Sequence, residues 1–472
     1  MTGTYIQIGG RHFSLSDQLD FSDFSGDINP IHIDPLEARK TISGECVVHG
    51  VNGFLWALEC LLNSHGSIPK NLKIDFLKPI YIGIQVICFW SELEKKIKIV
   101  SEKDDVLVSI RYDDFINGSS NLGNFPLPTL VEIQSPKTII FNSLDIGAKY
   151  KSEYGGKSVR VVTLYSQLCQ YLGANTVYEV SVLSNIVGMQ IPGLHSLFSK
   201  LEISFVDHEG CLVPFYQVTN KDERFGLIEL IYTGCNLTSR IVAFERPHHE
   251  PKKCFEIEGL IPESINLKEK RVLIIGGSRG IGAAFARVSS MLGADVTITY
   301  SAGEIDAQNV CADIKSHCGR IVKVISLDVT NPSKIESFNL DFDILCYFAS
   351  PKISRTKGDF DLSTFDNFYT FYCKSFEKIA LQFSHSGGGL IYWPSTTFLE
   401  QKIKGFNEYI LAKEIGEKVC KNLEDETNLK IIIERLDKTE TDQTLSVMRQ
   451  SLLDSVSVSI NIAKLLSYYT KV

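Results

Sequence analysis

Short runs of β-branched and aromatic residues alternate with charged turns through the first part of the chain, which is typical of strands. Val51 to Leu62 is a longer apolar stretch that follows Gly50, and its length predicts a helix. One helix with several antiparallel strands predicts an α+β unit over residues 1–125. The strands are predicted at 86–90, 97–100 and 106–112.

The same order of elements recurs over residues 148–248, where a helical segment at 161–172 precedes several strong strands. We therefore predict a second repeat of the first unit, with Pro126-Leu-Pro128 marking the boundary between them. A single unit of this kind exposes a sheet edge and a helix face, which pairing would bury. The strands of the repeat are predicted at 198–206, 212–218 and 226–232.

The pattern changes after residue 248. Residues 249–267 contain two prolines, several charges and few periodic apolar positions, which predicts a linker. From residue 268 the apolar run Arg271–Ile275, a glycine-rich turn and an amphipathic segment follow one another directly. A second strand is predicted at 295–299, so residues 268–472 are expected to form an α/β Rossmann domain with a doubly wound parallel sheet.

Composition limits the class of protein. The 472 residues are 44% hydrophobic and 22% charged, as in globular proteins, and the net charge of −8 argues against a nucleic-acid partner. The twelve cysteines include no C-x-x-C pair, so no metal site is predicted and free thiols in a reducing compartment are expected. Since no signal peptide and no apolar run of about 18–20 residues is found, we expect a cytoplasmic protein without a membrane span.

A carboxylate, an amide and an imidazole lie within six residues at Asp27, Asn29 and His32. Pro30 fixes one backbone angle, and Gly26 permits a sharp turn, so the loop is stiff. A carboxylate and an imidazole held together can bind one water and move its protons, as hydration of a double bond requires. The same residue types also form ordinary turns, so residues 25–32 alone do not decide between a catalytic pair and a turn.

Gly50 stands at the start of the predicted helix, where its N–H would be free. A helix N-terminus attracts negative charge, so a thioester carbonyl placed there would have its developing enolate stabilised.

Three blocks carry a family resemblance: Phe24-Ser-Gly-Asp-x-Asn-Pro-x-His32, Val47-Val-His-Gly50 and Phe76-Leu-Lys-Pro-x-Tyr-x-Gly83. Together they resemble the MaoC-like (R)-specific enoyl hydratases, which have the hot-dog fold, a long helix wrapped by an antiparallel sheet. The resemblance implies that Asp27 and His32 are the acid/base pair, that Asn29 orients them and that the Gly50 N–H holds the thioester oxygen. A small polar residue that some relatives carry on the central helix is replaced by Leu58.

The second repeat lacks this motif, so it is expected to shape the acyl pocket and to do no chemistry. His195 is the one residue there that invites a functional role, and a structural role is favoured for it.

Strand, glycine-rich turn and helix at 271–292 predict a dinucleotide site. The end of the second strand reads Tyr300-Ser301 and offers no carboxylate for ribose hydroxyls, and Arg279 could meet a 2′-phosphate, so NADP(H) is favoured over NAD(H). Asp328 could hold the adenine amine or cap the next helix, and the two are equally plausible. The predicted cofactor-binding residues are Gly276, Ser278, Arg279, Gly280, Ile281, Gly282, Ser301, Asp328, Ala349 and Lys413.

Tyr409 and Lys413 are four residues apart, on one face of a predicted helix. A nearby ammonium would favour the phenolate of Tyr409, which could then donate a proton to a carbonyl, with Ser395 or Thr396 as a hydrogen-bond partner. Residues 268 to about 440 resemble the short-chain dehydrogenase/reductase family, especially its 3-oxoacyl thioester reductases. Ser350 and Tyr372 depart from that family's pattern, the latter where an asparagine completes its proton relay.

These features predict a bifunctional enzyme that reduces 3-oxoacyl thioesters with NADPH and interconverts (R)-3-hydroxyacyl and 2-enoyl thioesters of coenzyme A or acyl carrier protein. A second hypothesis, favoured by Ser350 and Tyr372, is that only the hot-dog half is catalytic and the reductase-like domain binds nucleotide or a partner. A third is a non-enzymatic scaffold that docks acyl carriers. The resemblance also implies a homo-oligomer formed through the reductase domain.

Overall fold

The computed structural model describes residues 5–116, 135–152, 161–206, 213–353, 355–356, 358–442, 444–445 and 452–470. They form two compact units, the first ending at His248 and the second beginning at His249. The boundary predicted at Pro126–Pro128 lies outside the described residues.

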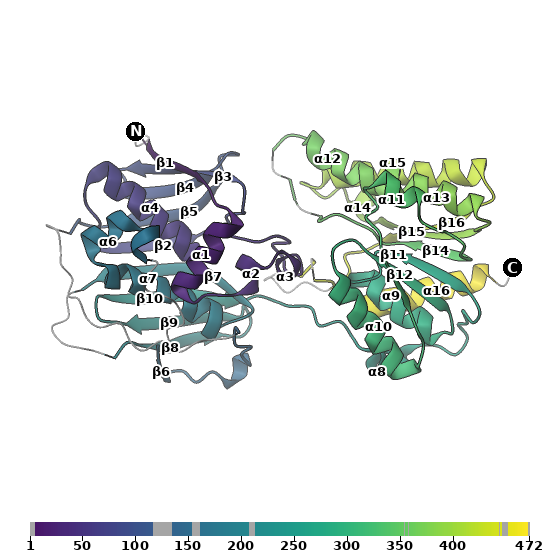
Figure 1. The fold of residues 1–472 in the computed structure, drawn as a ribbon, viewed down its shortest axis with the longest axis horizontal. Helices are drawn as coiled ribbons and strands as arrows, with labels where there is room; N and C mark the ends of the chain where they lie inside the picture. The colour runs from purple at the N-terminus through teal and green to yellow at the C-terminus, as the bar shows by residue number, and fades with distance from the viewer. Residues whose placement is uncertain are drawn as a thin grey trace. The chain divides into compact units, whose positions relative to one another are not determined.

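The first unit is an antiparallel sheet with helices on one face (Figure 1). Its elements are β1 (Ile6–His12), α1 (Leu15–Ser25), α2 (Pro30–Ile33), α3 (Pro35–Ala38), α4 (Gly50–His65), β2 (Asn71–Phe76), β3 (Gln85–Ser91), β4 (Lys96–Ser101), β5 (Val106–Tyr112), η1 (Phe141–Ser143), β6 (Lys149–Lys151), α5 (Val161–Leu164), α6 (Ser166–Leu172), α7 (Ala174–Asn185), η3 (Ile186–Gln190), β7 (Ser196–Phe205), β8 (Phe215–Asp222), β9 (Leu227–Thr233) and β10 (Leu237–Glu245).

The ten-stranded sheet of this unit has the order β1-β3-β4-β5-β2-β7-β10-β9-β8-β6. Read from either edge to the centre, the two halves of the sheet have the same strand order. From the edge inward, the first half reads β1, β3, β4, β5, β2 and the second reads β6, β8, β9, β10, β7. The halves meet at the antiparallel pair β2 and β7, where Leu72 lies opposite Ile203. The fold is therefore the predicted double hot-dog, and pairing at the centre covers an edge that each half would expose alone.

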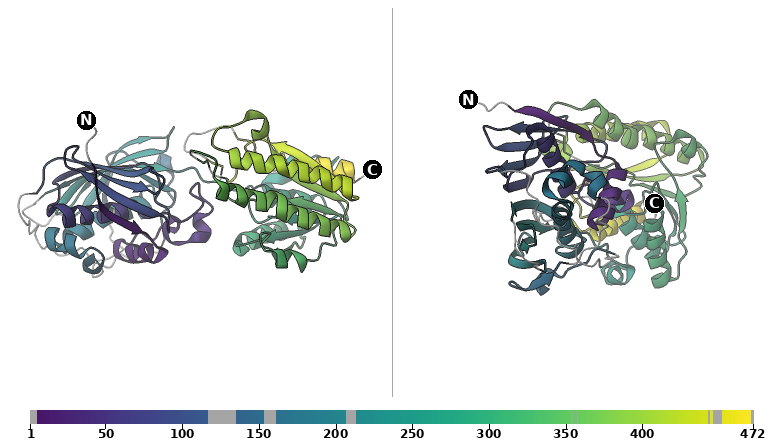
Figure 2. Two further views of the ribbon diagram at one scale, coloured as in Figure 1. Left: turned by 90° about the horizontal axis from the view of Figure 1, so that it is seen from above. Right: turned by 60° about the vertical axis from the view of Figure 1, so that its left-hand side comes forward.

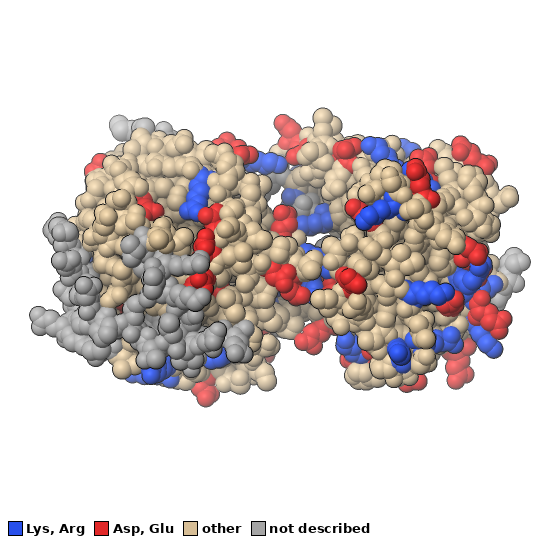
Figure 3. Space-filling view, in the orientation of Figure 1, with Lys and Arg blue, Asp and Glu red and all other residues tan. Residues whose placement is uncertain are grey.

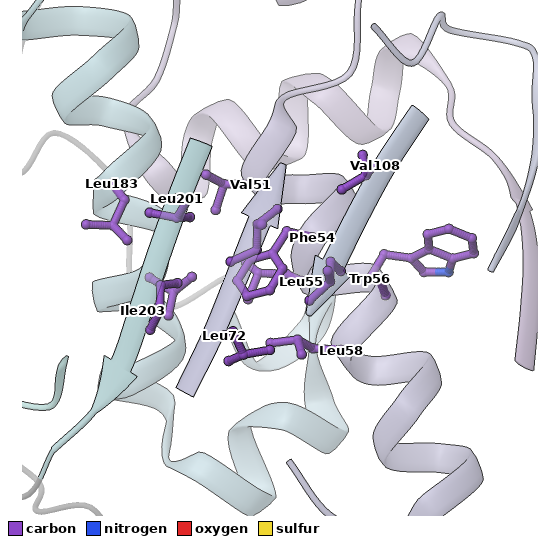
Figure 4. Packing of buried hydrophobic residues seen from close by; sticks show 14 of the residues in the cluster. Val51, Phe54, Leu55, Trp56, Leu58, Leu72, Val108, Leu183, Leu201 and Ile203 are labelled. Carbon is purple, nitrogen blue, oxygen red and sulfur yellow. The ribbon is translucent and has the colours of Figure 1, made fainter. Parts of the chain in front are cut away.

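The two central helices, α4 and α7, pack against the sheet and form one hydrophobic core with it. Figure 4 shows Phe54, Leu55 and Leu58 of α4 among side chains of the surrounding strands. Burial of each such large apolar side chain stabilises the fold by about 1.5–3 kcal/mol. The core thereby fixes the start of α4, where Gly50 lies.

The predicted helix at 51–62 and the three strands of the first repeat are confirmed. The helical segment predicted at 161–172 is two short helices, and the central helix of the second repeat is α7, which was not predicted. Three valines and one threonine in α7 disfavour an isolated helix, but their burial against the sheet overrides that preference.

The second unit is a parallel sheet with helices on both faces (Figure 2). Its elements are α8 (Cys254–Ile257), η4 (Glu258–Leu260), β11 (Arg271–Ile275), α9 (Gly280–Met291), β12 (Asp295–Tyr300), α10 (Glu304–Cys318), β13 (Lys323–Ser326), α11 (Pro332–Glu336), β14 (Ile344–Tyr347), α12 (Leu362–Tyr369), η5 (Thr370–Ser375), α13 (Phe376–His385), β15 (Leu390–Thr396), α14 (Phe398–Gln401), α15 (Asn407–Glu426), β16 (Lys430–Leu436) and α16 (Ser455–Tyr469).

The six strands of this unit follow the order β13-β12-β11-β14-β15-β16 and are all parallel, which is the doubly wound Rossmann topology predicted. One core lies between the sheet and α9, α10 and α16, and another lies between the sheet and α12, α13 and α15. Lysine and arginine side chains are interspersed with acidic ones over the face of this unit shown in Figure 3. Nucleotides bind this topology where the strand order reverses, between β11 and β14.

The segment 249–267 differs from the linker that its composition predicts. It contains α8 and η4, and four of its residues are buried in a core of the second unit. The apolar positions of this segment follow no regular period, so the sequence did not indicate that they are buried. Those residues are Cys254, Ile257, Ile265 and Leu267.

Within the described ranges, none of the helices combines the length and the apolar character that crossing a membrane requires.

Candidate active sites

The loop that carries the polar motif is fixed at both ends by helix capping. Gly26 ends α1 with a φ of 71°, a conformation that other residues rarely adopt. Asn29 caps α2 by accepting a hydrogen bond from the Ile31 backbone N–H, and Pro30 follows at the first helical position. Asp27 is thereby held in a short, rigid turn between two helices.

The Asp27 carboxylate is buried, with 1% of its surface exposed. Its Oδ1 accepts a hydrogen bond from the Asn29 backbone N–H at 3.2 Å, and its Oδ2 accepts one from Ser184 Oγ at 2.7 Å. Burial raises the pKa of Asp27, while His32 and these hydrogen bonds act in the opposite direction. Proton transfer at Asp27 is thereby brought nearer to neutral pH.

His32 presents one ring nitrogen to the site. Its Nδ1 lies 2.8 Å from Val47 O, and because a carbonyl only accepts, Nδ1 carries the proton. Burial lowers the pKa of His32, with Asp27 acting against this effect, so the neutral ring leaves Nε2 as a proton acceptor. One ligand atom each of Asp27, His32 and His49 lies within 4.8 Å of the others, a separation that one water can bridge.

His49 stacks on His32, with ring centroids 3.8 Å apart. Its Nδ1 lies 3.0 Å from Gln18 Oε1, and its Nε2 lies 3.0 Å from Asp27 O. Sequence spacing gave no sign of a three-residue group of this kind, which has the donor types of a metal site. Burial lowers the pKa of His49 well below its usual range, so its neutral ring donates a hydrogen bond to one of these two oxygen atoms.

Gly50 is the first residue of α4, and its N-cap, His49, supplies no side-chain hydrogen bond to the helix start. A Cβ at Gly50 would lie 3.0 Å from a ring carbon of Phe76, so a side chain there would be crowded. The helix start can therefore offer backbone N–H groups to an oxygen at close range.

The second repeat contributes directly to this site, which sequence reasoning missed. Ser184 on α7 donates to Asp27, and a Cβ at Gly188 would lie 2.3 Å from Asp27 Oδ1. Asn29 Nδ2 donates to Gly188 O at 2.8 Å and to Gly193 O at 3.1 Å, so its amide ties the loop to the second repeat. Leu58 is buried and apolar, and the side-chain hydroxyl that contacts Asp27 comes from Ser184 on the other central helix.

The glycine-rich turn of the second unit is shaped so that a ligand can approach the protein backbone closely. Gly276 has a φ of +80°, and a Cβ there would lie 3.0 Å from Ala349 N. A Cβ at Gly282 would lie 2.2 Å from Gly276 O. Arg279 is the N-cap of α9 and provides no side-chain hydrogen bond to it. The free helix start and the close-packed glycines fit the pyrophosphate of a dinucleotide, which Gly276, Gly280 and Gly282 would allow to approach.

Three other predicted cofactor residues have partners within the protein or lie at the surface. Arg279 Nη1 pairs with Asp442 Oδ2 at 2.5 Å. Asp328 Oδ1 accepts hydrogen bonds from Thr330. The N-cap of α11 is Asn331, so the alternative prediction that Asp328 caps this helix was wrong. Ser301 is exposed after β12. The remaining predicted residues, Ser278 and Ile281, lie in the turn and first turn of α9.

Tyr409 and Lys413 lie on α15, and Tyr409 faces Thr396 at the end of β15. Burial raises the pKa of Tyr409 to about 12, against a hydrogen bond with Thr396. Ser395 Oγ instead donates to Glu417 Oε1 at 2.6 Å. Successive residues of a strand point to opposite faces, so Thr396 is the hydroxyl that reaches Tyr409.

The sequence led us to expect that Lys413 lowers the pKa of Tyr409, but the group that lowers it is Thr396. Its Nζ donates to Pro394 O at 2.7 Å and lies over the ring of Tyr372, 3.9 Å from the centroid. Burial lowers the pKa of Lys413 to about 7. Tyr372 OH in turn lies 2.6 Å from Ser350 Oγ, so the two residues that depart from the family pattern contact each other.

Comparison with known protein families agrees with this division. The family described as a MaoC like domain matches residues 5–108, and the family described as short chain dehydrogenase matches residues 270–341. The chain therefore carries a MaoC-like dehydratase domain in its first unit and a short-chain dehydrogenase domain in its second.

Several characterised proteins are similar to parts of the chain. The mitochondrial 3-hydroxyacyl-[acyl-carrier-protein] dehydratase of Arabidopsis thaliana is 28% identical over 145 residues, which is 30% of this chain and 79% of that protein. The (R)-specific enoyl-CoA hydratase of Aeromonas caviae is 28% identical over 94 residues, which is 18% of this chain and 70% of that protein.

For the second unit, the chloroplastic NADPH-dependent aldehyde reductase 2 of Arabidopsis thaliana is 27% identical over 180 residues. The match covers 33% of this chain and 65% of that relative's length. A solved short chain dehydrogenase from Burkholderia cenocepacia in complex with NADP is 23% identical, covers 43% of this chain and 91% of its own, and has a TM-score of 0.39.

Proposed function

We propose that the first unit adds water to, and removes it from, the C2=C3 bond of an acyl thioester, interconverting (R)-3-hydroxyacyl and 2-enoyl forms. The observation that carries this is the pair of the buried Asp27 and the half-buried His32 beside the start of α4. The names of the dehydratase and hydratase relatives support the same substrate class.

The geometry suggests how water is used. Asp27 as a carboxylate and His32 through Nε2 are both acceptors, so a water between them donates both of its protons. Its lone pairs then face C3, where the new C–O bond forms as the C2=C3 π bond breaks. One proton passes from the water to the pair, and the pair returns a proton to C2. The N–H groups at the start of α4 stabilise the negative charge that develops on the thioester oxygen.

We propose that the second unit reduces a 3-oxoacyl thioester with NADPH, which would yield the 3-hydroxyacyl substrate of the first. A nicotinamide dinucleotide bound at the glycine-rich turn supplies the hydride. Tyr409 gives its phenolic proton to the carbonyl oxygen, and the Thr396 hydroxyl forms a hydrogen bond with that oxygen. The buried surroundings exclude water, which strengthens these contacts. The order of the two reactions suits synthesis of fatty acids or related acyl chains.

The preference for NADPH rests on Ser301, at a position without a carboxylate, and on Arg279 in the turn. Because Arg279 is paired with Asp442, a 2′-phosphate has to replace that carboxylate as its partner. The name of the NADPH-dependent relative agrees with this choice.

A second function has specific support: the second unit binds nucleotide or a partner without turnover. Lys413 is held at Pro394 O and against the Tyr372 ring, which occupies the place of a relay residue. In this case only the first unit is an enzyme.

The experiment incubates the purified full-length protein with acetoacetyl-CoA and NADPH, and follows both cofactor absorbance and the enoyl product by mass spectrometry. We expect cofactor oxidation followed by crotonyl-CoA in the wild type, loss of both in Tyr409→Phe, and unchanged hydration of separately added crotonyl-CoA by that variant. Hydration of crotonyl-CoA without any cofactor oxidation would establish the second function. Absence of both reactions over several chain lengths would refute the proposal.

A further inference from the structure

Arg246 follows β10 in the first unit and is a charged residue in a buried position. Only 8% of its surface is exposed, and it forms no ion pair with any described residue. Its Nη2 donates to Leu194 O at 3.0 Å, whereas its Nε is buried and has no hydrogen-bond partner in the described part of the chain. A buried charge without an acidic partner is strongly disfavoured, so such a group calls for an explanation.

The position of Arg246 relates it to the candidate active site. Leu194 O accepts hydrogen bonds both from Arg246 and from Asn29 Nδ2, which lies 3.4 Å away, so the guanidinium and the Asn29 amide share one acceptor. Asn29 also donates its backbone N–H to Asp27. The positive charge acts on His32 as well, where it favours the neutral ring.

His195 adds a second unsatisfied group at the same place. The Arg246 backbone N–H donates to His195 O at 2.8 Å, and His195 stacks on His248 with ring centroids 3.8 Å apart. The buried Nδ1 of His195 has no hydrogen-bond partner among the described residues. Burial and the neighbouring His248 and Arg246 lower the pKa of His195 to about 4, so its ring is neutral and can donate one N–H.

We propose that Arg246, assisted by His195, binds an anionic oxygen group of the acyl thioester beside the Asp27–His32 pair. This inference rests on the proposed function of the first unit and adds a determinant of its substrate class. The anionic group is a carboxylate on the acyl chain, which a guanidinium binds through charge-assisted hydrogen bonds, because the pantetheine arm separates the carrier phosphates from the reacting C2=C3 bond.

The experiment measures kcat and KM for hydration by the full-length protein with three substrates. Crotonyl-CoA carries the carrier phosphates, a 2-enoyl-CoA with a terminal carboxylate adds an acyl anion, and crotonyl-pantetheine has neither. The variants are Arg246→Met and Arg246→Lys. The control is Arg240→Met on β10, because Arg240 is exposed and pairs with Glu229.

For the substrate with the bound anion, Arg246→Met is expected to raise KM by about 10- to 100-fold, the worth of one charged hydrogen bond. Arg246→Lys should recover part of this effect, and Arg240→Met should behave as wild type. A penalty confined to the carboxylate substrate supports the inference, and an equal penalty with both CoA esters would contradict it.

An equal loss with crotonyl-pantetheine, or no loss with any substrate, would overturn the inference and leave Arg246 a structural residue. If Arg246→Met does not fold, the ratio between substrates measured in Arg246→Lys decides in the same way. Failure of the proposed function is distinct, because the wild type would then hydrate none of the three.

Discussion

At the scale of single residues, the site depends on two groups whose pKa values are shifted toward each other. Burial raises the pKa of Asp27 and lowers that of His32, since both lose the water that stabilises their charged forms. This convergence was not readable from the sequence, because it depends on burial by residues of the second repeat.

The pH dependence of hydration follows from these directions. Protonation of either Asp27 or His32 removes an acceptor for the water, so kcat/KM should fall as pH falls. The acid limb is expected above the ordinary value of about 3.9 for a carboxyl, because burial raises the pKa of Asp27. A pH profile of kcat/KM checks this, and a limb at or below the ordinary carboxyl value would contradict the assignment.

The same burial should make Asp27 a destabilising residue. Its pKa is higher in the folded than in the unfolded state, so stability is lost as pH rises through the folded value. Asp27→Asn removes the charge, and the Ser184 hydroxyl can rotate to accept from the new amide. We expect the variant to gain about 1 kcal/mol in free energy of unfolding at pH 8, less at pH 4.

Chemical denaturation at both pH values measures this gain. Ser181→Ala, a change in a hydroxyl that bonds only within α7, serves as the control for handling of the variants. A loss of stability at pH 8 in Asp27→Asn would show that the carboxylate is not penalised by burial.

At the scale of elements, the polar loop was predictable and its surroundings were not. Asp27, Asn29 and His32 are close in sequence, so their proximity follows from local turn chemistry. Ser184 and Gly188 reach the loop only because β2 pairs with β7 and brings α7 beside it. No local pattern announces such a contact, although a small polar residue on a buried helix could have been taken as a signal.

Ser184 on α7 is expected to position the Asp27 carboxylate. Removing its hydroxyl in Ser184→Ala deletes the contact that lowers the pKa of Asp27, so that pKa should rise further. The acid limb should therefore shift to higher pH, and kcat should fall about tenfold. Kinetics over pH test this beside Ser181→Ala, and an unshifted limb would count against the role.

In the second unit the strand β15 separates two hydroxyls that the sequence could not distinguish. Thr396 faces Tyr409, while Ser395 is held by Glu417. Thr396→Val should lower the rate of 3-oxoacyl reduction about 10²-fold, whereas Ser395→Ala should leave it within a small factor of wild type. The reverse outcome in an NADPH oxidation assay would show that Ser395 contacts the carbonyl.

At the scale of the whole molecule, each fold class was predicted from the sequence. The double hot-dog and the Rossmann sheet follow from motifs at fixed spacing and from strand–turn–helix order. The partners of Arg279 and Lys413 were not predicted, since Asp442 and Tyr372 are distant in sequence. Those contacts depend on packing rather than on a local sequence pattern.

The two activities should be separable by single substitutions, because each catalytic set lies within one unit. The most direct test of the central claim is the rate of crotonyl-CoA hydration by full-length wild type, Asp27→Asn and Tyr409→Phe. We predict rapid hydration by wild type and Tyr409→Phe, and a rate about 10²- to 10⁴-fold lower in folded Asp27→Asn. Hydration by Asp27→Asn at the wild-type rate would contradict the account.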